Sequence, residues 1–338
     1  MTRISLAVVA MTIPISAMAE TPSAVIEDIV NEHILPRFET LAETTEALSD
    51  TAATDCNPTS DTLRSAYGMA FDAWISASHL RFGPTEVDDR AFALAFWPDS
   101  RGATPRALST LISDQDPIAA SVADYAQVSI AARGFYAMEF LLFDEALMSA
   151  GDPDYHCQLV QTISEDIAQT SQDILDGWTT DYAATLQTPS ATGVYRSDEE
   201  ALQEMLKALS TGLQFTSDSR LGRPLGTFDQ PRPTRAEARR SARSSQHVTL
   251  SLVALQDLAL RLAIENEPLS NKLDTSFERA MSQLSDLNDP TFASVADPQP
   301  RLKVEIIQQS VDAIRTIVRD ELGPTLGVAA GFNSLDGD

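Results

Sequence analysis

Basic residues are scarce in this sequence of 338 residues, which is long enough for a sizeable core and one or two domains. It has 24 Lys and Arg against 49 Asp and Glu, and its formal net charge is −25 at pH 7. A surface this acidic repels the phosphates of nucleic acids and of anionic lipids. We therefore expect no nucleic-acid partner and no general binding to membrane surfaces, whereas such a charge suits a protein that handles cations.

Common catalytic and metal-binding signatures are also missing. The sequence has no His-Glu-x-x-His, Gly-x-Ser-x-Gly, P-loop or Gly-x-Gly-x-x-Gly pattern. Its four histidines are His33, His79, His156 and His247, and no two of them stand four residues apart. A zinc site of three histidines would need nearly all of them to converge from different helices. The sequence does not predict such a site.

Long apolar runs are confined to the first residues. Arg3 precedes a mostly apolar stretch from Ile4 to Ile15, and Ala17-Met18-Ala19 then has the pattern of a signal-peptide cleavage site. No later run reaches the roughly 18 residues that a membrane helix needs. The sequence thus predicts a signal peptide over residues 1–19, export, most simply to the periplasm, and no transmembrane segment.

Cysteine is limited to Cys56 and Cys157. An oxidising compartment favours a disulfide between them. Closing so long a loop contributes about 4–5 kcal/mol in the chain-entropy model. Two separate buried thiols are the alternative, and two cysteines alone make a poor zinc site.

The rest of the chain has a helical pattern. Apolar residues recur at intervals of three and four, and strand-like alternation is almost absent. The expected helices cover residues 26–41, 63–77, 118–143, 160–178, 197–213, 234–263, 273–287 and 302–322. They predict an all-α fold in which two four-helix-bundle-like halves, residues 20–190 and 191–338, pack together. Residues 81–103 and 216–233 fit no helix; such long connections are often functional, or they cap the ends of the bundles.

The expected helix over residues 118–143 carries the sharpest local signal. Gly134 costs a helix interior about 1 kcal/mol relative to Ala, so we expect close packing or a local break there. Tyr136 and Glu139 share a helix face, and Glu139 has strongly apolar neighbours. A buried carboxylate needs a partner such as Arg, a metal ion or a proton. A structural Arg–Glu ion pair that connects two helices is the simpler alternative to a binding site.

This segment resembles the signature of the imelysin-like proteins, Gly-x-His-x-x-Glu before an apolar run. Gly134 and Glu139 match it, and Tyr136 stands where the histidine belongs. Residues 78–84, 95–99, 220–226 and 331–338 resemble this family as well, so the similarity spans nearly the whole chain. It implies two four-helix bundles, an exported bacterial protein, an association with iron uptake, and the peptidase label that imelysin itself carries.

The tyrosine changes what the resemblance implies about metal. If the family's His and Glu are metal ligands, this chain keeps one of the two. Tyr136 and Glu139 form an all-oxygen pair, which suits a hard ion such as Fe(III) better than zinc; as a packing residue, Tyr136 would instead mark the loss of the site. Metal-assisted hydrolysis needs about three protein ligands and a base. Because Glu139 can fill only one of these roles, the sequence identifies no catalytic residue.

Arginine is concentrated in one segment of the second half. Seven of the 24 basic residues lie between positions 220 and 243, where the only acids are Asp229 and Glu237. The spacing of those at positions 232, 235, 239 and 243 predicts a row on one face of the expected helix. Such a row can clamp carboxylate or phosphate groups. The alternative is that the arginines pair with the acidic first half, Glu139 included, and hold the halves together.

The leading interpretation is an exported, non-enzymatic imelysin-like protein. We expect a cleft between the halves that binds iron or an anionic iron chelate, and partners among the iron-transport proteins of the envelope. A metal-dependent peptidase and an envelope scaffold without a small ligand are the alternatives. The candidate metal ligands are Tyr136 and Glu139, and the candidate ligand-binding residues are Gly134, Tyr136, Glu139, Arg220, Arg223, Trp97, Asp99 and Arg101.

Overall fold

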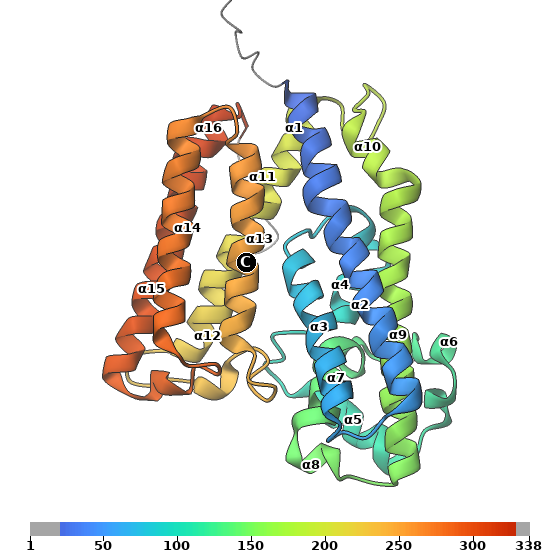
Figure 1. Cartoon of the computed structure of the whole chain (residues 1–338). Helices are drawn as coiled ribbons and strands as arrows, with labels where there is room; N and C mark the ends of the chain where they lie inside the picture. Colours follow the sequence, from blue (N-terminus) through green and yellow to red (C-terminus); the bar gives the residue numbers. More distant parts are fainter. Residues whose placement is uncertain (1–20, 329–338) are drawn as a thin grey trace, which may run out of the picture.

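The computed structural model describes residues 21–328, and these contain helices and turns but no strand. The expected all-α fold is thereby confirmed. The predicted signal peptide and the family-like stretch 331–338 lie outside the described residues. Long helices form two groups that stand side by side, which we call the first half (residues 21–187) and the second half (residues 198–328) (Figure 1).

The first half is built around one long helical rod. Its parts are α1 (Pro22–Asp28), the π-helical turn η1 (Ile29–Ile34) and α2 (Leu35–Thr54). Helix α2 packs against α3 (Asp61–Ala77) and α9 (Pro153–Gly177), and α9 also contacts α7 (Gly134–Phe143). Shorter helices complete this half: α4 (Arg90–Leu94), α5 (Ala103–Asp114), α6 (Val122–Tyr125), α8 (Glu145–Met148) and α10 (Ala183–Gln187).

The second half contains four long helices, α11 (Asp198–Gln214), α13 (Ser244–Leu262), α14 (Glu267–Leu287) and α15 (Pro298–Ile317). Helix α14 packs between α13 and α15, and α11 contacts both α13 and α15. The π-helical turn η7 (Phe215–Leu221) extends α11 and leads into α12 (Gly222–Leu225), and α16 (Gly323–Thr325) follows α15 and its own π-helical turn. The apolar faces of the four long helices are buried, as expected for amphipathic helices.

Helix α13 joins the two halves. It lies between α14 of its own half and α3 of the first half (Figure 1), and it also contacts η1. Helix α1 meets α11 on the same boundary. The contact between the halves therefore runs along α13, α3, η1, α1 and α11.

The expected helix over residues 118–143 is wrong in its extent. That stretch contains a 3₁₀ turn (Pro117–Ala120), α6, a second 3₁₀ turn (Ile130–Ala132) and finally α7. Gly134 explains the late start of α7, because its φ is +74° and a Cβ atom there would lie 2.2 Å from the backbone oxygens of Ala93 and Leu94. The close packing and the break that we expect at Gly134 are both present.

The expected helix over residues 234–263 is also wrong in its first third. A 3₁₀ turn covers Pro233–Arg235, turns follow, and α13 begins at Ser244. Ala238 and Ala242 have φ angles of +46° and +56°, which a helix cannot accommodate. The arginines at positions 232, 235, 239 and 243 consequently share no helix face. We call residues 226–243 the arginine loop.

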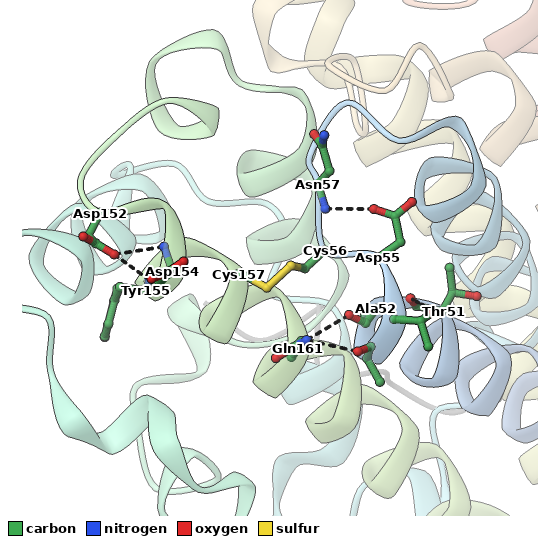
Figure 2. Close-up of a disulfide and its surroundings, with 12 residues drawn as sticks. Thr51, Ala52, Asp55, Cys56, Asn57, Asp152, Asp154, Tyr155, Cys157 and Gln161 are labelled. Atoms are coloured by element: carbon green, nitrogen blue, oxygen red, sulfur yellow. Dashed lines mark hydrogen bonds between the residues drawn. A yellow bond between two sulfur atoms is a disulfide. The ribbon is translucent and has the colours of Figure 1, made fainter.

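A disulfide joins Cys56 and Cys157, whose Cα atoms are 5.1 Å apart. Figure 2 shows Cys56 in the connection that follows α2 and Cys157 near the start of α9, where Asp152 accepts two backbone hydrogen bonds. Gln161 on α9 also donates a hydrogen bond to the carbonyl of Ala52 at 3.2 Å. The bridge therefore ties one end of the first half together, and the alternative of two separate thiols is wrong.

Candidate functional site

Glu237 of the arginine loop is the centre of a buried polar cluster between the halves. Its side chain accepts a hydrogen bond from Nε of Arg220 at 2.7 Å. Tyr136 on α7 donates its hydroxyl to the other carboxylate oxygen at 2.5 Å. His247 on α13 places Nδ1 at 3.3 Å from the oxygen that Arg220 also contacts. One residue from the first half and three from the second thus form what we call the Glu237 cluster.

The charge of this cluster is balanced. Burial opposes ionisation of Glu237, but Arg220, His247 and the Tyr136 hydroxyl hold its pKa at about 2. Burial and the neighbouring Glu237 raise the pKa of Tyr136 well above its ordinary value. Tyr136 is therefore a neutral donor and Glu237 an ionised acceptor at neutral pH, with Arg220 as the countercharge.

Glu139 contacts a different part of the arginine loop. It is 2% exposed, and one of its oxygens accepts hydrogen bonds from the backbone N–H of Ser241 at 3.0 Å and from its hydroxyl at 2.8 Å. The carboxylate is buried as the sequence predicts, but its hydrogen-bond donors come from a serine and not from the expected arginine. Tyr136 and Glu139 are thus bonded to separate residues of one loop.

Some arginines of the second half do bridge to the first half. Arg240 donates to Asp144 at 2.8 Å, and Arg243 pairs with Asp72 on α3. The guanidinium of Arg240 also lies 3.7 Å from the centre of the Phe140 ring. These contacts support the interpretation that part of the arginine segment fastens the halves together.

Arg223 differs from these paired arginines. It forms no ion pair with any described residue, and its Nε is buried without a hydrogen-bond partner. Its guanidinium lies 5.6 Å from the ring centre of the half-buried Trp97, which in turn stacks on Tyr136 at 6.3 Å. Burial and the nearby Arg235 both lower the pKa of Arg223. Two like charges without a carboxylate between them attract an anion.

The other candidates on the long connection have local contacts. Asp99 accepts backbone hydrogen bonds from Arg101, Ala103 and Thr104 and thereby caps the start of α5. Arg101 is exposed, and its carbonyl accepts a hydrogen bond from Arg106. No contact between described residues joins Asp99 or Arg101 to the Glu237 cluster. Of the eight predicted ligand-binding residues, the structure groups Tyr136 with Arg220, and Trp97 with Arg223 and Tyr136.

A second polar cluster between the halves was not predicted from the sequence. His33 on η1 contacts Asp257 on α13 through Nδ1 and His79 through Nε2, both at 2.8 Å. Asp257 also pairs with Arg37 and Arg261. We call these residues the His33 cluster; 46 residues separate its two histidines, and no spacing rule in the sequence connects them.

An open groove of about 490 Å³ runs along α2 and α3. Arg37 and Asp72 lie in its walls, and both also bond to residues of the second half, Asp257 and Arg243. The groove therefore borders the boundary between the halves. No three His, Cys, Asp or Glu side chains gather as a metal site among residues 21–328. Within the same range, no helix is long and apolar enough to cross a membrane.

Comparison with known proteins identifies related sequences and folds. The family model described as Imelysin, peptidase family M75, matches residues 34–318. An imelysin-like protein from Psychrobacter arcticum 273-4 has a similar structure, with a TM-score of 0.78 and 20% identity over 96% of this chain and 100% of that one. A putative iron-regulated protein A precursor from Parabacteroides distasonis ATCC 8503 matches with a TM-score of 0.74 and 15% identity, over 90% of this chain and 96% of that one. No curated protein is significantly similar to the chain.

Proposed function

The chain belongs to the imelysin family, and from this premise we propose that it is an exported protein that binds a carboxylate-bearing iron chelate between its two halves. The link to iron is supported by the iron-regulated protein of similar fold. The proposed export rests on the signal-peptide pattern of residues 1–19. We further propose that residues 20–190 and 191–338 are its two domains, and that it delivers its cargo to transport proteins of the envelope.

The unpaired state of Arg223 is the observation that carries this proposal. Several described arginines form no ion pair, but Arg223 alone among them has a buried Nε without a hydrogen-bond partner. A planar guanidinium binds a carboxylate through two parallel hydrogen bonds. Trp97 holds the Arg223 side chain from one side, and exposed Arg235 adds a second positive charge. This pair of arginines is the proposed anion site.

Direct coordination of iron by Tyr136 and Glu139 is the alternative to binding an intact chelate at Arg223. It would require Tyr136 to give up the proton that it donates to Glu237, and Glu139 to exchange its two hydrogen bonds from Ser241 for the metal. Both costs fall on buried groups. A chelate that keeps its own ligands around the iron needs neither change, so we place the iron, as cargo, outside the Glu237 cluster.

Isothermal titration calorimetry with ferric citrate tests the anion site. Wild-type protein is expected to bind ferric citrate, and Arg223→Ala to weaken this binding by about tenfold to a hundredfold, as expected for a lost charged hydrogen-bond pair. Arg319→Ala is the matched control, because it removes an exposed arginine that pairs with the neighbouring Asp320. Its affinity should equal that of wild type.

Two results would contradict this assignment. Equal affinities of wild type and Arg223→Ala would show that this arginine does not bind the chelate. Loss of iron binding in Glu139→Gln, with Arg223→Ala unaffected, would transfer the site to direct coordination. Titration with citrate alone separates recognition of the chelate from recognition of any carboxylate.

A further inference from the structure

The His33 cluster spans the boundary between the halves, and its two histidines are buried. His33 is on η1 and His79 lies two residues after the end of α3, both in the first half, whereas Asp257 is on α13 of the second half. The two imidazoles are 0% and 5% exposed. Their ring centres are 5.1 Å apart, and their Nε2 atoms share one hydrogen bond of 2.8 Å. A π-helical turn such as η1 is a rare departure from the α-helix and is frequently found at functional sites.

The contacts of this cluster permit one arrangement of protons when both histidines are neutral. Burial opposes ionisation of Asp257, yet His33, Arg37 and Arg261 keep its pKa far below the ordinary value, so its carboxylate only accepts. His33 must then carry its proton on Nδ1 and accept on Nε2. It follows that His79 donates from Nε2. The remaining nitrogen of His79, Nδ1, is buried and has no hydrogen-bond partner.

An additional proton has no favourable place in this arrangement. On His33 it would occupy Nε2, and the hydrogen bond to His79 would then survive only if neutral His79 moved its own proton to the buried Nδ1, which has no partner. On His79 it would occupy Nδ1, where no described acceptor is present. Either imidazolium would also face several cations. The charged groups around the pair are Asp257 and Arg261 on α13, Arg37 on α2, Arg220 on η7, and Asp28 of α1, which is bound to Arg261.

The direction of the pKa shifts agrees with this geometry. Burial lowers the pKa of His33 to about 4, although Asp257 favours the charged form. Burial, His33, Arg37 and Arg220 lower the pKa of His79 well below its ordinary value. In the separated halves, both imidazoles would be in water and would bind protons near their ordinary pKa of about 6.5. Acid therefore favours any state in which the halves have moved apart at this point.

We propose that the His33 cluster is an acid-sensitive latch, which holds the two halves together at neutral pH and releases their contact when its histidines bind protons. Release would open the boundary along which α13 meets α3 and η1. Because the Glu237 cluster and the proposed anion site lie on this same boundary, acidification would change access to both. The latch depends on the His33 cluster and stands whether or not the proposed ligand is correct.

Hydrogen–deuterium exchange of the intact protein at about pH 7.5 and about pH 5, corrected for intrinsic exchange rates, tests the latch. Acid should reduce protection of the contact segments, residues 29–34, 78–82 and 255–261, by about tenfold or more in wild type. Residues 156–170 of α9, which the disulfide holds within the first half, should keep their protection. In His79→Gln the acid response should be reduced to the part that His33 contributes, since a glutamine amide can donate to His33 without titrating.

His156→Gln is the matched control. His156 is buried and burial lowers its pKa, but it lies on α9 within the first half. This variant should retain the acid response of the contact segments. His33→Gln provides a second test if His79→Gln does not fold. Contact segments that stay protected in acid, or an acid response that His156→Gln abolishes and His79→Gln does not, would overturn the proposal.

Discussion

The two polar clusters between the halves stabilise their buried polar side chains in opposite ways. The Glu237 cluster contains an ionised carboxylate, which Arg220, Tyr136 and His247 surround at 2.5 to 3.3 Å. The His33 cluster places two neutral imidazoles at its most buried point and leaves its charged members nearer to solvent. The Glu237 cluster is stable while the carboxylate of Glu237 stays paired with Arg220. The His33 cluster is stable while neither histidine binds an additional proton.

Because of this difference, the contributions of Glu237 and His33 to stability change in different pH ranges. The pKa of Glu237 is about 2 in the folded protein and near 4.5 in an unfolded chain, so its contribution is complete above about pH 4.5. The pKa of His33 is about 4 when folded and 6.5 otherwise, so its contribution changes between those values. At mildly acidic pH the contribution of Glu237 is therefore unchanged, whereas that of His33 falls.

Replacing Arg220 should have the largest effect. Arg220→Ala leaves Glu237 buried without its countercharge, and such a loss costs about 3–5 kcal/mol of the free energy of unfolding. Urea denaturation at neutral pH measures it. The double variant Arg220→Met/Glu237→Gln should be less destabilised than the single one, because no isolated charge remains. A loss below about 1 kcal/mol in Arg220→Ala would show that buried Glu237 does not depend on Arg220 as its countercharge.

Acid titration should give the next largest effect. Between pH 6.5 and about 4, the unfolded chain binds a proton at His33 that the folded protein does not, so the free energy of unfolding falls as the pH falls. The loss from His33 amounts to about 3 kcal/mol over this range, and His79 adds to it in the same direction. In His33→Gln, urea denaturation should show a shallower pH dependence. An identical slope in wild type and variant would assign the acid sensitivity elsewhere.

Tyr136→Phe should have a smaller effect than either change. It removes one hydrogen bond to an ionised carboxylate, which is worth about 1.5–3 kcal/mol, while Arg220 and the packing against Phe71 and Trp97 remain. Because the phenol is a neutral donor, this loss should be the same at pH 7 and pH 5. A loss that grows toward acid would indicate that the hydroxyl interacts with a group that titrates in that range.

Much of the architecture follows from sequence patterns, because helical periodicity and apolar faces are local properties. The four long helices of the second half, the disulfide, the close packing or break at Gly134 and the burial of Glu139 could all be predicted. The family signature also indicated the segment that holds Tyr136. The two expected helices that proved too long share a cause: Gly134, Ala238 and Ala242 have positive φ angles that apolar spacing does not reveal.

The centres of both clusters could not be predicted. Glu237 was visible only as one of two acids among seven arginines, and its role depends on a loop that folds back over α7 to meet Tyr136. His33 and Asp257 are 224 residues apart and meet because α13 packs on η1. Such contacts are set by the packing of the halves, which the spacing of residues within one helix does not encode.

The most direct test of the contrast between the clusters is nuclear magnetic resonance of the imidazole nitrogens, which reports tautomer and pKa together. The chain has four histidines, and single His→Gln variants assign their signals. We expect His33 to carry its proton on Nδ1 and His79 on Nε2; His33 should not titrate above about pH 5, and the pKa of His79 should also lie well below its ordinary value. A His33 that titrates near pH 6.5, or a His79 protonated on Nδ1 at neutral pH, would contradict the neutral pair on which this account of the boundary depends.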